Sequence, residues 1–407
     1  MNKKVVIIGS LDTKEAEFRY VESILTSSGV STLLINTGIY ETTCEADITN
    51  EEVAAAGGVT LEELRKKQDR GLAVATMAKG AAVQVQKLVG QNEVAAIFGM
   101  GGTAGTTVAA TAMKEAPIGV PKLIVSTVAS GNTRPYVGEK DIMMMYSVVD
   151  IAGINSLSAQ ILKNGANALA GMVQGADIKV DVEKKPMIAA TMFGVTTPCV
   201  TKARERLEEE GYDVLVFHAT GTGGDAMEAL IQDGYIEAVA DITTTEFADQ
   251  LVGGVFSAGD QRLESAAAKK IPQVISVGAL DMVNFGPRDS VPEQFKDRIF
   301  YQHNPTTTLM RTTVEENSQL GEIIARKINQ APKTSVVVFP KGGVSLLDRD
   351  GQPFEGVLER EALYASLKEN LHPDVQFIEV EEDINEPTVA NVIVDHLLHL
   401  MKKEVQA

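Results

Sequence analysis

The chain has 407 residues, 44% of them hydrophobic and 23% charged, which is typical of globular proteins. At about 100–200 residues per domain, this length predicts two or three domains. The formal net charge of −18 disfavours binding to nucleic acid or to an anionic membrane surface. The two cysteines, Cys44 and Cys199, lie far apart, which argues against a disulfide scaffold and fits a cytoplasmic protein.

The N-terminal half alternates short apolar runs with helical patterns. The runs predict strands at residues 5–8, 32–35, 95–98, 122–125 and 142–149. Helices are predicted at residues 14–27, 61–89, 106–114 and 157–173, with a polar stretch around residues 42–58. The first apolar run is too short for a signal peptide, and no run reaches the roughly 18 apolar residues of a membrane span.

The C-terminal half repeats this plan after a polar, lysine-rich segment at residues 175–185. Strands are predicted at residues 187–190, 214–217, 239–241, 273–277, 335–339 and 375–379, and helices at 198–210, 225–232, 263–270, 315–329, 359–369 and 386–401. We therefore predict an α/β fold of two tandem Rossmann-like subdomains with mostly parallel doubly wound sheets, spanning residues 1–180 and 186–407. The alternative is two α/β halves that did not arise by duplication.

A glycine-rich segment, GMGGTAG at residues 99–105, follows the strand at 95–98 and precedes a helix. Four glycines let the backbone approach a ligand, and the helix N-terminus offers unpaired N–H groups to an anion. The segment lacks the Gly-Lys-Ser/Thr of a Walker A loop, and its G-x-G-G-x-x-G spacing departs from the dinucleotide fingerprint. We predict phosphate binding here; a tight turn without a ligand is the alternative.

Three more loops of small polar residues follow strands of the first half, at residues 9–14, 36–38 and 126–133. Ligands of doubly wound sheets bind beyond the carboxyl ends of the strands, so these loops are expected to border the same site. Asp12 is either a ligand contact or a simple helix N-cap. Arg70 either lends a cation to a phosphate or lies on the surface.

The second half has loops of the same kind at residues 220–225, 241–246 and 276–281, and glycines 221–224 are expected to match the segment 99–105. His218, Glu246 and Asp281 are candidates for acid–base catalysis, although His218 also fits a structural role. Cys199 follows Pro198 at a helix start, where it is either activated by the helix dipole or simply buried. Metal-site motifs such as HExxH are absent from the sequence, so Mg²⁺ is expected only on a nucleotide.

Six stretches resemble the family of the tomato mosaic virus resistance protein, a plant inhibitor of viral RNA replication. They are IVSTVASG (124–131), SVVDIAGIN (147–155), TMFGVTTPCV (191–200), FHATG (217–221), DITTTE (241–246) and SVGALDMVNFGP (276–287). The resemblance implies two Rossmann-like subdomains, ATP with Mg²⁺ bound chiefly by the first, and a homodimer. The nucleotide site that it implies consists of Asp12, Thr13, Thr37, Arg70, Gly101, Gly102, Thr103, Ala104, Thr127, Ser130 and Gly131.

Three functions remain open at this point. The first is an ATP-binding protein in which the nucleotide orders the two halves. The second is an enzyme that uses ATP to act on a small metabolite at the second-half loops, and the third is a non-catalytic protein-interaction module. Plant members of the family bind a viral helicase, an activity that we do not carry over. Larger plant relatives append a barrel domain, so the resemblance suggests a separate barrel-domain protein as a partner.

Overall fold

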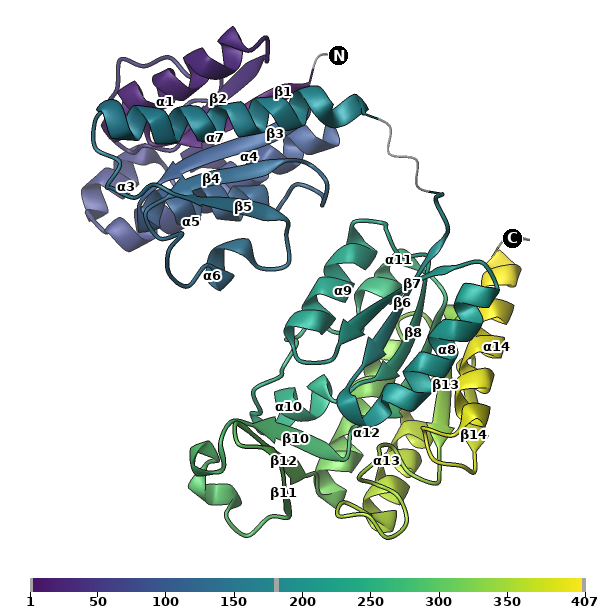
Figure 1. Cartoon of the computed structure of the whole chain (residues 1–407). Helices are drawn as coiled ribbons and strands as arrows, with labels where there is room; N and C mark the ends of the chain where they lie inside the picture. Colours follow the sequence, from purple (N-terminus) through teal and green to yellow (C-terminus); the bar gives the residue numbers. More distant parts are fainter. Residues whose placement is uncertain (1–2, 179–182, 405–407) are drawn as a thin grey trace. The chain divides into compact units, whose positions relative to one another are not determined.

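The computed structural model of the chain describes residues 3–178 and 183–404. It consists of two compact units, Met1–Asp181 and Val182–Ala407, each with its own parallel sheet and its own hydrophobic cores (Figure 1). The predicted end of the first domain, at residue 180, lies outside the described residues. Among the described helices, none is long and apolar enough to cross a lipid bilayer.

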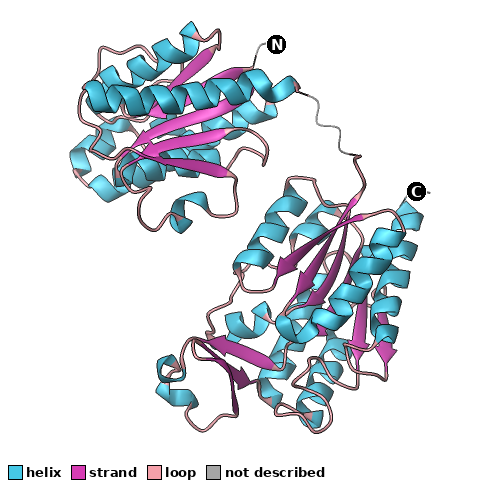
Figure 2. Ribbon diagram, viewed as in Figure 1, coloured by secondary structure: helices cyan, strands magenta, loops and turns pink. Residues whose placement is uncertain are grey.

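The first unit is a five-stranded parallel sheet in the order β2-β1-β3-β4-β5, with helices on both faces (Figure 2). Its elements in chain order are β1 (Lys4–Gly9), α1 (Leu11–Ser27), β2 (Thr32–Asn36), α2 (Asn50–Gly57), α3 (Leu61–Lys67), α4 (Arg70–Gly90), β3 (Val94–Gly101), α5 (Thr103–Met113), β4 (Lys122–Ser126), α6 (Arg134–Val137), β5 (Ile142–Tyr146) and α7 (Ser156–Gln174). Helices α1 and α7 pack on one face, and α2, α4 and α5 pack on the other.

The continuous apolar run of β1 follows from this layering. Val5 and Ile7 point into the core beneath α1 and α7, whereas Val6 and Ile8 point into the core beneath α4 and α5. Side chains of a strand alternate between the two faces of a sheet, so a strand covered on both faces needs an apolar residue at every position. The prediction of a doubly wound parallel sheet is thereby confirmed for this unit.

The first unit departs from the predicted elements at α2 and at the end of β3. It also has a short helix, α6, that was not predicted, and β5 ends at Tyr146 instead of residue 149. The stretch predicted as polar, residues 42–58, contains the helix α2. Its signal was a capping box: the Thr49 side chain accepts from the Glu52 N–H at 3.3 Å, and Glu52 accepts from the Thr49 N–H at 2.8 Å. The second difference is at β3, which runs on to Gly101, three residues beyond the predicted end.

The second unit contains a six-stranded parallel sheet in the order β14-β13-β9-β8-β6-β7. Its elements are β6 (Met187–Met192), α8 (Thr197–Glu209), β7 (Asp213–His218), α9 (Thr222–Gln232), β8 (Ala238–Thr243), α10 (Glu246–Val252), α11 (Ser265–Lys269), β9 (Gln273–Gly278), β10 (Met282–Phe285), β11 (Phe300–Asn304), β12 (Thr307–Arg311), α12 (Val314–Ile328), β13 (Ser335–Pro340), α13 (Val357–Asn370), β14 (Gln376–Val380) and α14 (Pro387–Glu404). Helices α8 and α14 cover one face of the sheet, and α9 and α11–α13 cover the other.

Both parallel sheets follow the same winding rule. When the strands of each sheet are numbered in chain order, the first unit reads 2-1-3-4-5, and the second reads 2-1-3-4-5 with a sixth strand added. The chain therefore changes direction between β1 and β3 in the first unit, and between β6 and β8 in the second. The loops diverge at such a switch point and leave a crevice at the carboxyl ends of the two strands.

This topology corrects one sequence-based expectation. The segment 99–105 spans the end of β3 and the start of α5, and the strand that matches β3 in the second unit is β8. Its counterpart is therefore the loop at residues 243–246. Glycines 221–224, which were expected to match, follow β7 and correspond in position to the loop after β2.

A three-stranded antiparallel sheet, β10-β12-β11, lies between β9 and β13 in the chain and was not predicted. Its strands lack a regular alternation of apolar and polar residues because polar side chains are buried on them. Asn284 and Thr308 are 0% exposed, and Arg311 is 5% exposed. Hydrogen bonds made within the fold compensate for burying Asn284 and Arg311, and a hydropathy pattern cannot show such bonds.

Candidate functional site

A pocket of about 590 Å³ lies at the switch point of the first unit, outside the carboxyl ends of β1 and β3. This volume falls within the range of about 300–1,000 Å³ that is usual for small-molecule sites. The predicted site residues that line it are Asp12, Thr13, Thr37, Arg70, Gly101, Gly102, Thr103 and Ala104. The tertiary structure thus brings together residues that lie up to 92 positions apart in the sequence.

The other three predicted residues do not line this pocket. Thr127 borders it: its N–H donates to the Gly101 carbonyl at 3.2 Å, and its hydroxyl lies 3.6 Å from the point where a Cβ on Gly102 would stand. Ser130 and Gly131 follow in the turn after β4, where both are exposed.

The glycines of the segment 99–105 have different tasks. A Cβ on Gly99 would lie 2.4 Å from Ala109 Cβ, and one on Gly105 would lie 2.9 Å from the Met100 carbonyl oxygen. These two glycines let α5 pack directly on β3. Gly101, with φ of +154°, ends the strand in a conformation that favours glycine. Only Gly102 connects β3 to α5.

The N-terminus of α5 faces the pocket without a side-chain cap. The N–H groups of Thr103, Ala104 and Gly105 belong to the first turn, where no partner exists within the helix. Helix α1 also lacks a side-chain cap, although its first N–H, on Leu11, donates to Asn36 Oδ1 at 3.2 Å. These ends carry the positive pole of the helix dipole and favour an anion.

Helix α4 reaches the same pocket but is already capped. Asp69 Oδ1 accepts from the Leu72 N–H at 3.0 Å, so a carboxylate occupies the position that an anion would take. The positive pole available to a bound anion therefore lies on the α1 and α5 side of the pocket. The α4 side carries the carboxylate of Asp69 together with the guanidinium of Arg70.

Charged side chains of both signs line the pocket in equal number. Lys14 donates to the Ile151 carbonyl and Arg65 to the Ile39 carbonyl, whereas Arg70 is exposed and has no ion pair within residues 3–178. The six are Lys14, Arg65, Arg70, Asp12, Asp69 and Asp150. In a chain with a net charge of −18, this balance makes the pocket a comparatively favourable place for an anion.

Asp12 does not cap its own helix, which was the alternative to a ligand contact. It lies in the first turn of α1, where Ser10 is the N-cap residue. Its Oδ2 accepts from the N–H groups of Ile39 and Tyr40, both at 3.0 Å, and its Oδ1 is buried without a hydrogen-bond partner. Asp12 therefore fixes the segment after β2 against the start of α1.

The corresponding crevice of the second unit is filled by its own side chains. Arg262 is 1% exposed, donates to Asp241 at 2.5 and 2.7 Å, and donates to Glu246 at 2.6 Å. The other oxygen of Glu246 accepts from the N–H groups of Gly221 and Gly224 at 2.9 and 3.2 Å. A carboxylate thus occupies the N-terminus of α9, the position that a bound anion would take. Burial raises the pKa of Glu246, although Arg262 opposes the shift.

The three candidates for acid–base catalysis lie in different surroundings. His218 is exposed at the end of β7, with its ring edge-on to Phe193 at 5.4 Å between centroids. Glu246 and Asp281 are each 1% exposed. Between residues 183 and 404 the structure gives no hydrogen bond that joins the His218 ring to either carboxylate.

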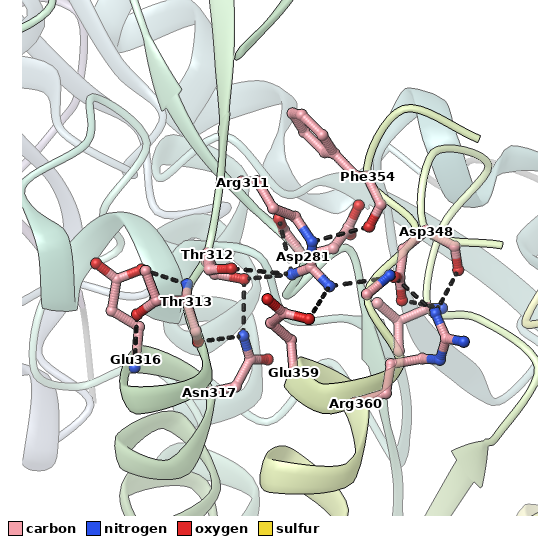
Figure 3. A network of polar contacts seen from close by, with 12 residues as sticks. Asp281, Arg311, Thr312, Thr313, Glu316, Asn317, Asp348, Phe354, Glu359 and Arg360 are labelled. Atoms are coloured by element: carbon pink, nitrogen blue, oxygen red, sulfur yellow. Dashed lines mark hydrogen bonds and ion pairs between the residues drawn. The ribbon is translucent and has the colours of Figure 1, made fainter. Parts of the chain in front are cut away.

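Asp281 belongs to the polar network drawn in Figure 3. Its Oδ2 accepts from the Ser345 hydroxyl at 2.8 Å. Asp348, in the same network, accepts from Arg311 at 3.1 Å and from Arg360 at 2.8 Å. The network joins the loops after β9 and β13 to β12 and α13. Burial, together with the charge of Asp348, raises the pKa of Asp281 to about 7.

The cysteines offer no reactive thiol. Cys199 is 1% exposed, and burial raises the pKa of its thiol to about 12, so the thiolate is not formed at neutral pH. The structure confirms the simpler of the two interpretations of this residue. Across residues 3–178 and 183–404 there is no group of three or more His, Cys, Asp or Glu side chains that could hold a metal ion.

Sequence reasoning did not place Tyr40, Leu64, Arg65, Val74 or Met77 in the site. They line the pocket from the segment after β2 and from α3 and α4. The available signal was topological: everything between β2 and β3 must pass close to the switch point. Local motifs could not show it, because Leu64, Arg65, Val74 and Met77 read as ordinary helix positions and Tyr40 as part of a loop.

The protein is thus an α/β protein of two doubly wound units. The crevice at the switch point is open in the first unit and filled by side chains in the second. Two family models match the chain: the N-terminal domain of uncharacterised protein family UPF0261 over residues 3–177, and its C-terminal domain over residues 185–401. The chain belongs to this family, which confirms the resemblance seen in the sequence.

Several relatives match along the whole chain. A UPF0261 protein of Clostridium tetani is 50% identical to this chain, and the alignment covers 99% of this chain and 100% of the relative. The ToMV resistance protein Tm-1(GCR237) of Solanum lycopersicum is 40% identical over 98% of this chain, which spans 56% of that protein. Among solved structures, the UDP-GlcNAc 2-epimerase of Methanocaldococcus jannaschii aligns with 67% of this chain and 83% of its own chain, at 8% sequence identity and a TM-score of 0.23. This likeness is too small to add to the fold described above.

Proposed function

We propose that this chain binds ATP in the pocket at the carboxyl ends of β1 and β3. The observation that carries the proposal is the uncapped N-terminus of α5, which opens into a pocket of about 590 Å³ with three cationic side chains in its lining. Unpaired N–H groups and nearby cations are what a phosphate chain requires. The buried, paired side chains of Arg262 and Glu246 in the second unit favour the first unit as the nucleotide-binding one.

Mg²⁺ enters this proposal as part of the nucleotide. The described residues offer no cluster that could hold the ion by themselves. The carboxylate of Asp150 lines the pocket, is exposed, and can supplement the phosphate oxygens as a ligand. Asp12 also lines the pocket, but its carboxylate is already held by the N–H groups of Ile39 and Tyr40. Metal binding is therefore expected only in the presence of the nucleotide.

Calorimetry with ATP and Mg²⁺ tests the proposal directly. We expect a dissociation constant well below 1 mM and no heat from Mg²⁺ added alone. Failure to bind ATP at concentrations up to about 1 mM would contradict the proposed function. Inorganic phosphate is the control, and it should bind more weakly because it reaches fewer of the N–H groups.

The enzyme alternative has less support. Two of its three acid–base candidates, Glu246 and Asp281, are 1% exposed and hydrogen-bonded inside the second unit. The third, His218, is exposed, but within residues 183–404 it has no hydrogen bond to either carboxylate. Screening pooled metabolites for ATP-dependent turnover separates the two functions. A role as an interaction module is suggested only by the name of the tomato relative. That name refers to virus resistance conferred by the tomato protein and not to a property of this chain.

We also propose that the chain forms a homodimer in the cytoplasm. The two buried, unpaired cysteines fit a reducing compartment. The strand β5 ends the first sheet, carries no charged residue, and leaves Met143 and Tyr146 39% and 44% exposed. The opposite edge, β2, is covered by residues 47 and 48. An uncharged open edge favours pairing with a second copy about a twofold axis.

A further inference from the structure

The pocket of the first unit has two chemically different sides. The side formed by the loops after β1 and β3 presents N–H groups, hydroxyls and Lys14. The opposite side is formed by the segment after β2 and by α3 and α4, and it combines apolar and aromatic side chains with charged and polar ones. Its apolar and aromatic residues are Ile39, Tyr40, Leu64, Ala73, Val74 and Met77, and its charged and polar residues include Arg65, Gln68, Asp69 and Arg70.

The segment 37–40 on the second side is fixed through its backbone. Its N–H groups at Ile39 and Tyr40 donate to Asp12. Its carbonyls at Gly38 and Tyr40 accept from Asn50 Nδ2 at 3.0 and 3.4 Å, and the Ile39 carbonyl accepts from Arg65. Side chains from α1, α2 and α3 thus hold successive peptide groups of one short segment.

The side chain at the end of this fixed segment is nevertheless in solvent. Tyr40 is 60% exposed, although it lines the pocket of about 590 Å³ and also a neighbouring pocket of about 490 Å³. An aromatic ring on a pre-organised backbone loses little conformational entropy when a flat ligand stacks on it. The surrounding contacts give Tyr40 no role in the core of the unit.

We propose, building on the nucleotide site proposed above, that Tyr40 is the residue on which the nucleobase stacks. The phosphates then lie at the uncapped N-terminus of α5, and the base lies toward α3 and α4. The helix termini support this direction, because the Asp69 carboxylate already occupies the N-terminus of α4, whereas the N-terminus of α5 has no side-chain cap. The ligand class is therefore a nucleotide with its base, and neither a bare polyphosphate nor a sugar phosphate.

The chain contains no tryptophan, which allows a direct spectroscopic test. In full-length Tyr40→Trp, the single indole is expected to change its fluorescence when ATP with Mg²⁺ is added and to stay unchanged with tripolyphosphate and Mg²⁺. Val255→Trp is the matched control, because Val255 is 59% exposed and lies in the second unit. A fluorescence change that is the same for both ligands, or the same in both variants, overturns the assignment of Tyr40.

Affinities measured by calorimetry provide the second test. Tyr40→Ala should weaken ATP binding about tenfold or more, the size expected for loss of one base–aromatic stack, and should leave tripolyphosphate binding unchanged. Tyr40→Phe should bind ATP like the wild type. If Tyr40→Ala binds ATP with wild-type affinity, or loses both ligands equally, Tyr40 is not the stacking residue.

A wrong assignment of Tyr40 can be distinguished from the absence of the nucleotide site itself. If the wild-type protein binds neither ATP nor tripolyphosphate, the proposed function is wrong and the role of Tyr40 fails with it. If the wild type binds ATP and only the Tyr40 variants behave differently from expectation, the site stands and the orientation of the nucleotide is wrong. Thermal unfolding of each variant confirms that it is folded.

Discussion

At Gly102, a substitution can change ligand binding in the proposed site with little damage to the fold. A Cβ at this position has only Thr127 Oγ1 nearby, at 3.6 Å, and the backbone has φ of −77° and ψ of −159°. These angles suit an N-cap residue, and aspartate is among the preferred N-caps. Its carboxylate would then bind the N–H groups of α5, as Asp69 does for α4.

We therefore expect Gly102→Asp to weaken ATP binding at least tenfold while its thermal unfolding temperature stays the same or rises. Calorimetry and thermal unfolding measure the two effects. Gly194→Asp is the matched control, because Gly194 is an exposed glycine of the second unit with no atom within 4 Å of a Cβ. Undiminished affinity in a folded Gly102→Asp protein would place the site elsewhere.

Asp281 makes the stability of the second unit depend on pH. Its carboxyl is buried, its Oδ1 has no hydrogen-bond partner, and its pKa is raised to about 7 by burial and by Asp348. The folded state therefore keeps a proton that the unfolded state loses near pH 4. Because the folded state binds more protons between pH 4 and 7, the free energy of unfolding falls as the pH rises through this window.

Asp281→Asn should reduce this pH dependence. The amide oxygen can still accept from Ser345, so we expect the variant to match or exceed the wild type at pH 8, by about 1–3 kcal/mol at most. Denaturant unfolding at pH 5 and pH 8 measures the change. Asp249, whose pKa burial also raises to about 7, retains its share of the dependence. Asp289→Asn, at an exposed position, is the control, and an equal effect there would refute the role of Asp281.

Among the secondary-structure elements, the edge strand β5 forms the proposed dimer interface. Its side chains alternate between the two cores, so Met144 and Met145 are partly buried on opposite faces. Its outer edge has no strand beside it in the first sheet. Natural proteins usually protect such an edge with charge, proline or a covering segment. In the proposed dimer, the unprotected sequence Ile-Met-Met-Met-Tyr is the edge that a second copy would cover.

A lysine on this edge should oppose association. We expect Met143→Lys to shift the native mass in dilute solution from dimer to monomer, because two copies of the charge would meet across the twofold axis. Val83→Lys, on α4, introduces the same charge at an apolar position that is 43% exposed and should leave the dimer intact. A dimer that persists in Met143→Lys would exclude this edge as the interface.

Across the whole molecule, the two units differ in what their shared topology leaves open. The first unit has an open crevice lined by an uncapped helix, and the second has Arg262 and Glu246 in the matching place. Because each unit has its own sheet and cores, we expect a fragment of residues 1–181 to fold alone and to bind ATP with the affinity of the full chain. A fragment of residues 182–407 should fold without binding ATP.

Circular dichroism and calorimetry on the two fragments test this division. If nucleotide affinity appears only in the full chain, the site requires residues from both units. That result would favour the hypothesis that the nucleotide orders the two halves, and it would contradict a pocket completed by the first unit alone.

Much of the fold and part of the site were predictable from local pattern. Continuous apolar runs such as Val5 to Ile8 predicted strands covered on both faces, and the segment 99–105 predicted a helix N-terminus open to an anion. The strands β10 and β12 were missed because Asn284, Thr308 and Arg311 are buried on them, which removes the alternation that reveals a strand. Arg65 and Tyr40 were missed because only the path of the chain brings α3 and the segment after β2 to the pocket.

By itself, the sequence determined the class of fold, the repeated winding of its two halves, and the loops that end at the ligand edge of each sheet, because these depend on periodicity and on glycine positions. The tertiary structure alone decided at which loops the protein's own side chains fill the helix N-terminus and at which loops it stays open. Glu246 lies 22 residues from Gly224 in the chain yet fills the N-terminus of α9. Two of the four glycines between residues 99 and 105 serve the packing of α5 on β3, and Gly102 alone has room beside it. Such outcomes depend on distances between side chains from different elements, which no local pattern encodes.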